Sequence, residues 1–187
     1  MPRRNVKIEH PASLNELDSL LRQVPGADST TGLKPSVVYR GQSKDWPLES
    51  SLLRLAGDSA DLEKRIGSQL RSLGLVEDAP LGGGSDFTMW PHAQHYGCPT
   101  RLLDWSESPL FALYFAVTST PNKQGALWLL RPLELNKLAT SNAKEAKFIP
   151  SFDDQLLDNY STESIEANSF EGVIPMAAIA TRNNTRI

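Results

Sequence analysis

Residues 110–117 form a run of eight apolar or aromatic side chains, with no charged position at any helical spacing. Ser108 followed by Pro109 is a favourable helix start, because serine caps helices and proline suits the first turn. A helix without a polar face is expected to be buried on every side. The run therefore predicts one fully buried central helix, which the rest of the fold has to cover.

Helical and strand patterns alternate irregularly around this run. A capping box at Ser13–Glu16 begins a helix over 13–24, and apolar spacing or a terminal glycine predicts helices over 58–73 and 86–96. Residues 37–39 and 125–130 are expected to form strands, 146–150 and 173–178 weaker ones, and 101–105 a short strand or extended turn. The fold class predicted is mixed α+β, one domain with a small, mostly antiparallel sheet packed on helices.

Composition sets limits on location and partners. A net charge of −3 gives no overall basic signature, so nucleic-acid binding would need a local basic patch. One cysteine excludes an internal disulfide framework, and no apolar run is long enough for a membrane span. The basic N-terminus lacks the apolar stretch of a signal peptide. We expect a cytoplasmic protein that contacts no membrane.

Two polar segments are expected to form the working surface. The first is Tyr39-Arg40-Gly41-Gln42, delivered by the strand over 37–39. The second runs from Gln94 to Trp105 with the sequence QHYGCPTRLLDW, around the end of a helix. Together with Ser50 to Arg54 and the tryptophan-bearing strand at 125–130, these motifs resemble the FRG domain family, named for its (Phe/Tyr)-Arg-Gly motif.

The resemblance divides the chain into a lead-in helix region, 1–34, and an FRG-like domain, 35–187. Family members continue past an Arg-Ile pair, here Arg186-Ile187, which implies a domain truncated at its C-terminus. They occur in bacteria and phages, often in settings of defence or conflict, and their chemistry is largely uncharacterised. The resemblance therefore implies the location of the functional site, but it implies little about the reaction or binding event at that site.

Arg40, Arg54 and Arg101 each stand beside strongly apolar neighbours. An arginine held against a core is rarely left unmatched, because burying a lone charge is costly. Either Asp104 or Glu49 pairs with them internally, or the cluster binds a phosphate or carboxylate ligand. Three arginines against one obvious acid favour the anionic ligand slightly.

His95 lies near a helix end, where Asp104 could orient it as a general acid or base; the alternative is a backbone contact at a tight turn. His92, His95 and Cys98 have a spacing that invites a metal, but paired cysteines are absent and we expect no metal site. Cys98 is explained as well by a buried thiol as by a nucleophile.

The residues expected to act in catalysis are His95, Asp104 and Arg40. Those expected to bind ligand are Tyr39, Arg40, Gln42, Arg54, Gln94, Arg101 and Trp105. Trp46, Trp90, Trp105 and Tyr96 either stack on a base or nicotinamide ring or belong to the core. The glycines at 82–84 match no phosphate loop and are expected to be a linker.

Three functions stay open on these residues. The first is an enzyme acting on a nucleotide-like substrate such as NAD, because Arg40 and the Ser50-Ser51 pair loosely resemble the NAD-holding residues of some ADP-ribosyltransferases. No catalytic glutamate stands out, and such an analogy does not establish function. The second is a non-catalytic module for nucleic acid or a phosphorylated ligand, with nucleic acid disfavoured by the acidic composition. The third is a protein-interaction domain with architectural motifs.

Overall fold

The computed structural model describes residues 7–24, 37–55, 59–73, 89–118, 120, 123–139, 148–152, 154–161 and 174–179. Its elements are, in order, α1 Leu14–Arg22, β1 Val38–Gln42, α2 Ser59–Ser72, α3 Met89–His95, α4 Pro109–Thr118, β2 Ala126–Leu130, α5 Pro132–Ala139 and the 3-10 helix η3 Gln155–Tyr160. Helices with a small antiparallel sheet confirm the predicted α+β class. None of the described helices is long and apolar enough to cross a membrane.

Local sequence signals explain most of these elements. Ser13 caps α1, because its side chain accepts a hydrogen bond from the Glu16 amide while the Glu16 carboxylate binds the Ala12 amide. Gly97 ends α3 with a φ of +85°, the left-handed conformation that glycine adopts without strain. The predicted glycine linker at 82–84 lies outside the described residues.

The sheet places β1 between two neighbours. On one side β1 pairs antiparallel with β2, with Tyr39 opposite Leu129 and Arg40 opposite Trp128. On the other side Tyr39 forms a two-hydrogen-bond bridge with Ser106, at 2.7 and 2.8 Å. Residues 102–105, in the segment predicted as a strand or extended turn, form no strand, and the bridge to β1 lies at the next residue, Ser106.

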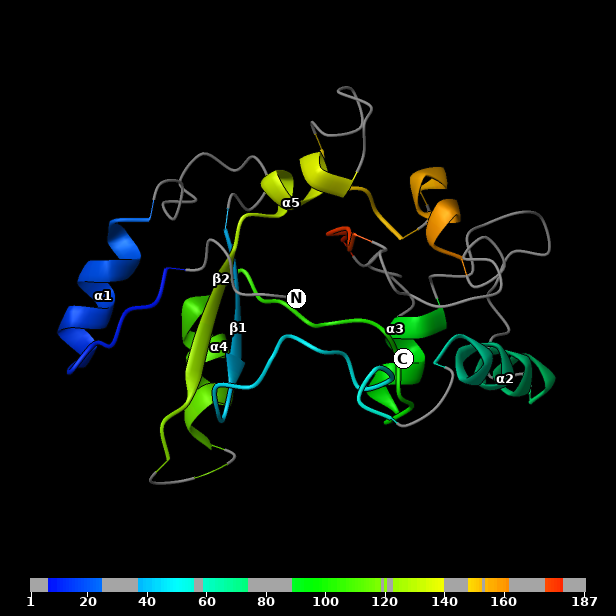
Figure 1. Ribbon diagram of the computed structural model, residues 1–187, viewed down its shortest axis with the longest axis horizontal. Helices are drawn as coiled ribbons and strands as arrows, with labels where there is room; N and C mark the ends of the chain where they lie inside the picture. Colours follow the sequence, from blue (N-terminus) through cyan, green and yellow to red (C-terminus); the bar gives the residue numbers. More distant parts are fainter. Residues whose placement is uncertain are drawn as a thin grey trace, which may run out of the picture.

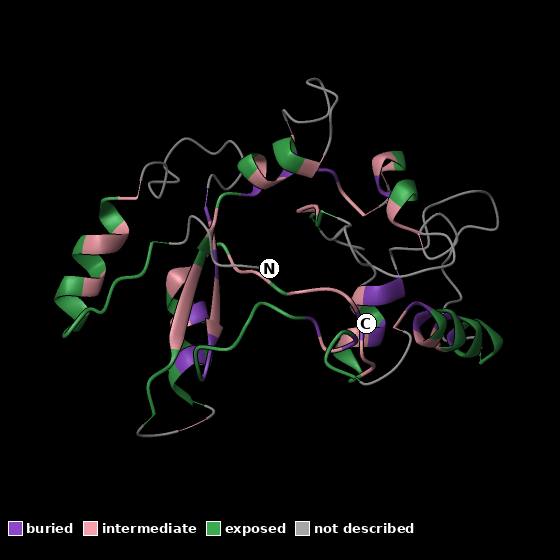
Figure 2. Cartoon of the chain, viewed as in Figure 1, coloured by how far each residue is buried: buried purple, intermediate pink, exposed green. Residues whose placement is uncertain are grey.

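Helix α4 lies against the sheet through its small residues. Ala112 and Ala116 are buried, whereas Phe111 is 66% and Tyr114 59% exposed. Gly41 permits this close packing, because a Cβ there would lie 1.7 Å from the Ala112 carbonyl oxygen. The predicted fully buried central helix is wrong: its main packing partners among the described elements are β1 and β2, which cover one face (Figure 2).

Buried side chains gather in two clusters. One joins β1 to α4 through Val37, Tyr39 and Ala112. The other joins α2, α3 and η3 through Leu70, Met89, Trp90, Ala93 and Leu157. Figure 1 shows α4 against the sheet and α2 with α3 farther along the molecule, while the chain that follows β1 and the chain that follows α3 run between these two parts.

The weak strand predictions at 146–150 and 173–178 are wrong for their described residues, which contain no strand. Residues 151 and 179 nevertheless form a single parallel bridge. Helix α5 was not predicted, whereas η3 lies in an acidic stretch that was expected to be irregular or helical. Helix α5 is fixed by buried Asn136, whose amide donates to the Ala177 carbonyl at 2.9 Å and accepts from the Ala177 amide at 2.7 Å.

We expect Asn136→Ala to lower the free energy of unfolding by about 2 kcal/mol, because the backbone groups of Ala177 lose both hydrogen-bond partners. Urea unfolding followed by circular dichroism measures the change. A loss below about 0.5 kcal/mol, the size of an ordinary surface substitution, would show that this contact does not hold α5 in place.

Candidate functional site

The two predicted polar segments meet beside β1. Arg40 donates from Nη1 to the backbone carbonyl of Asp104 at 2.7 Å, next to the bridge between Tyr39 and Ser106. Residues more than sixty positions apart in sequence thus share one surface. This contact explains why the chain carries both motifs, since neither forms the surface alone.

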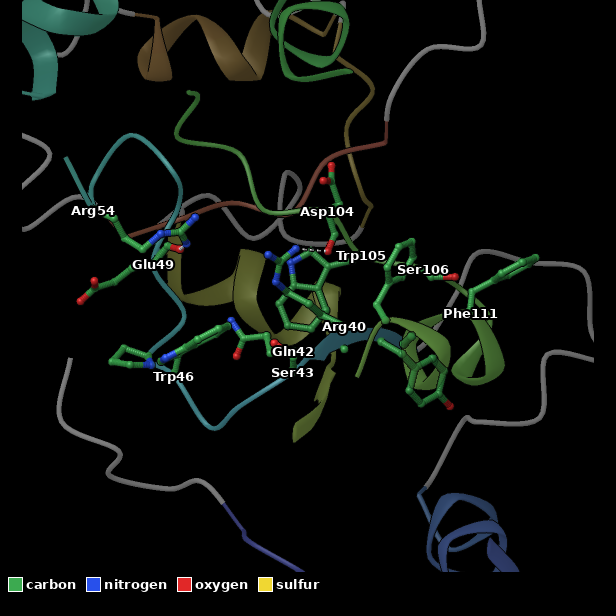
Figure 3. Close-up of a pocket in the computed structure, with 15 residues that line it drawn as sticks. Arg40, Gln42, Ser43, Trp46, Glu49, Arg54, Asp104, Trp105, Ser106 and Phe111 are labelled. Carbon is green, nitrogen blue, oxygen red and sulfur yellow. Dashed lines mark hydrogen bonds between the residues drawn. The ribbon is translucent and has the colours of Figure 1, made fainter. Parts of the chain in front are cut away.

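A cavity of about 790 Å³ opens on this surface (Figure 3). Charged, hydroxyl and aromatic side chains line it together. The lining residues are Tyr39, Arg40, Gly41, Gln42, Ser43, Trp46, Pro47, Glu49, Arg54, Asp104, Trp105, Ser106, Phe111, Ala112 and Phe115. Its volume is in the range of sites that hold small-molecule ligands.

The guanidinium of Arg40 has spare donors. Its Nε is buried and has no hydrogen-bond partner among the described residues. Burial lowers the pKa of Arg40 from its ordinary value, the Asp104 carboxylate raises it and the nearby Arg54 charge lowers it again. Because arginine stays charged at neutral pH, the result is a partly desolvated cation at the cavity wall.

Arg54 is the second cation at the cavity. Its Nη1 donates to the Glu49 backbone carbonyl at 2.7 Å. In Figure 3 the carboxylates of Glu49 and Asp104 point away from the two guanidinium groups. Within the described parts of the chain, neither Arg40 nor Arg54 forms an ion pair, so their charges are available to a ligand.

The Asp104 carboxylate is held from behind the cavity. Gln94 donates from Nε2 to Asp104 Oδ2 at 2.5 Å, and the fully buried Thr100 hydroxyl donates to Gln94 Oε1. Thr100 is fixed in turn by Ser51, whose hydroxyl binds its amide and carbonyl at 3.0 and 3.1 Å. Gln94 therefore positions Asp104 without lining the cavity. The backbone carbonyl of Asp104 in turn positions Arg40.

Arg101 does not join the predicted arginine cluster. It forms an ion pair with Glu63 of α2, Nε to Oε1 at 3.0 Å, with the two side chains 12% and 0% exposed. This internal pairing is the alternative that the sequence left open, but the acid comes from neither Asp104 nor Glu49. The cluster at the cavity is therefore Arg40 with Arg54.

His95 also lies off the cavity wall. Its ring is exposed and makes an edge-to-face contact with Tyr96 at 5.5 Å, while the Asp104 carboxylate is bound by Gln94 instead. Cys98 and Trp90 belong to the core around α3. Among the described residues, no three histidine, cysteine, aspartate or glutamate side chains could hold a metal ion.

Of the predicted ligand-binding residues, Tyr39, Arg40, Gln42, Arg54 and Trp105 line the cavity, as does Asp104. Sequence reasoning missed Ser43, Pro47, Ser106, Phe111 and Phe115. Phe111 and Phe115 stand four apart on α4, a spacing that places both on one helix face. That signal was present in the sequence, but the uniform apolarity of the run assigned both residues to the core.

The fold and site together define a small α+β domain with an arginine-lined, aromatic-walled cavity. The sequence model of the FRG domain family matches residues 35–125, so the chain contains an FRG domain. Both arginines and all lining residues fall inside the match. The extension of this domain to 187 stays a prediction. Comparison with curated proteins and with solved structures gives no match.

Proposed function

We propose that this FRG domain binds an anionic, nucleotide-like ligand in the cavity, with Arg40 and Arg54 holding its phosphates. The observation that carries the proposal is that both guanidinium groups line the cavity and bind only backbone carbonyls among the described residues. Charge-assisted hydrogen bonds from arginine are strong and geometrically suited to phosphate.

Aromatic walls support the nucleotide half of the proposal. Trp46, Trp105, Phe111 and Phe115 line the same cavity as the arginines. Tryptophan and phenylalanine offer flat faces on which a base or a nicotinamide ring stacks. NAD and ADP combine such a ring with phosphates, so we propose them as ligands of the right class.

Calorimetric titration of the full chain with NAD, ADP and adenosine tests this proposal. We expect NAD and ADP to bind with dissociation constants of about 1 mM or lower, weakening as salt screens the phosphate contacts. Adenosine, which lacks phosphate, is the control and should bind at least about 10-fold more weakly. Equal affinity for adenosine, or no binding of NAD and ADP, would contradict the proposal.

Catalysis is the second step of the proposal: transferase or hydrolase action on the bound nucleotide, in the bacterial or phage conflict setting that the family resemblance implies. Arg40, Asp104 and His95 stay the predicted catalytic residues, although His95 is not part of the cavity lining. Incubation with labelled NAD, followed by detection of transfer or hydrolysis, tests this step. If NAD binds but is not turned over, the result would contradict the proposed catalysis and would still agree with the proposed ligand binding.

A further inference from the structure

Gln42 is held with its amide in one orientation. The indole Nε1 of Trp128 donates to Gln42 Oε1 at 2.7 Å. Because a tryptophan N–H is only a donor, it must face the oxygen of the amide and not its nitrogen. Trp128 pairs with Arg40 across the sheet, so the neighbouring strand fixes the Gln42 side chain.

This contact engages the Gln42 oxygen and leaves both N–H groups of the amide for another acceptor. Its Nε2 forms no hydrogen bond with any described residue, while the side chain is 8% exposed and lines the cavity. The nitrogen is not among the fully buried atoms without a partner, so it is open to the cavity, where a ligand oxygen can take the place of water. The oriented amide therefore matches an oxygen on the ligand.

Arg40 offers a second unsatisfied donor on the same side of β1. Alternate residues of a strand point to one face, so the Arg40 and Gln42 side chains leave β1 together, with Cα atoms about 6.6 Å apart. The buried Nε of Arg40 also has no partner among the described residues. Two donors on separate residues suit acceptor oxygens on two adjacent groups.

We propose that the ligand is a diphosphate, with Arg40 binding one phosphoryl group and Gln42 donating to the other. In this assignment, which rests on the proposed function, Gln42 is a specificity-determining residue that selects diphosphates over monophosphates. Trp128 is a positioning residue that keeps the Gln42 N–H groups turned to the ligand. Arg54 supplies the second positive charge for the second phosphoryl group.

Titration of the full chain and its variants with ADP and AMP tests the assignment. The wild-type chain should prefer ADP about 10-fold, the factor expected for one hydrogen bond to a charged group. In Gln42→Met this preference should fall about 5-fold, and the preference that remains is the contribution of Arg54. Gln42→Glu still accepts from Trp128 but repels phosphate, so it should bind ADP at least about 10-fold more weakly than Gln42→Met. Gln69→Met, at an exposed glutamine of α2, is the matched control and should behave as wild type.

Nuclear magnetic resonance of the Trp128 indole N–H tests the positioning role without any ligand. The signal should move in Gln42→Met and stay near its wild-type position in Gln42→Glu, which retains an acceptor. Trp128→Phe should lose much of the ADP preference while Gln42 is still present. An unchanged ADP preference in Gln42→Met, or an unmoved indole signal, overturns this assignment even if ADP binds. Failure of the wild-type chain to bind either nucleotide overturns instead the proposed function on which the assignment rests.

Discussion

Arg40→Met is expected to weaken ADP binding at least about 100-fold, because it removes the only cavity cation that also carries a buried, unsatisfied donor among the described residues. Methionine keeps the length of the side chain and its apolar packing while deleting the charge. Arg40→Lys should lose about 10-fold, since an ammonium keeps the charge but not the planar fork. Calorimetry at fixed ionic strength measures both changes.

Arg65→Met is the matched control for charge. Arg65 lies on α2, is exposed, and pairs with Asp61 within its own helix, away from the cavity lining. The Arg65→Met substitution removes one positive charge from the chain without changing the cavity lining. The affinity for ADP should therefore change by less than about 2-fold. If Arg40→Met and Arg65→Met lose equal affinity, the cavity is not the binding site. Circular dichroism establishes that each variant is folded.

Gly41→Ala is expected to lower the free energy of unfolding by about 3 kcal/mol or more, the upper range for overpacking a tight contact. The new methyl would lie 1.7 Å from the Ala112 carbonyl oxygen and 2.8 Å from the Ala116 amide nitrogen. Both atoms belong to the backbone of α4, so relief requires the helix to move off β1. Urea unfolding of the variant measures the loss.

Gly67→Ala makes the same chemical change with the opposite expectation. Gly67 lies within α2, where the nearest atom to a new Cβ is the flexible end of the Met89 side chain at 3.2 Å. Alanine also favours a helix interior over glycine, by about 1 kcal/mol. The variant should therefore be as stable as wild type or slightly more stable. If the Gly41→Ala variant were as stable as the wild-type chain, that result would contradict the close packing of α4 on β1.

Local patterns predicted α1 to α4 and both strands, because caps and periodicity act within a few residues. Ser13, Gly97 and Pro109 each stand at the helix end where the sequence placed them. The burial of α4 could not be predicted in the same way. An apolar sequence indicates that burial of the helix is favourable. How much of its surface is buried depends on which other elements pack against it. Here Ala112 and Ala116 permit close contact on one face only.

The site was predictable where the motifs are continuous in sequence. Arg40 and Asp104 stand in the two polar segments, and the structure brings them into hydrogen-bond contact. The pairing of Arg101 was not predictable, because Glu63 looks like one more charged position on an amphipathic helix until α2 is placed against residue 101. Nothing in the local sequence distinguishes this buried glutamate from the exposed charges around it.

Arg40 and Arg54 are proposed to bind the phosphates of a nucleotide in the cavity beside β1. A crystal structure of the full chain grown with ADP tests it most directly. We expect electron density for the diphosphate between the two guanidinium groups, with a phosphate oxygen within hydrogen-bond distance of Arg40 Nε. Ordered ADP bound elsewhere on the chain, with both guanidinium groups in contact with solvent alone, would contradict it.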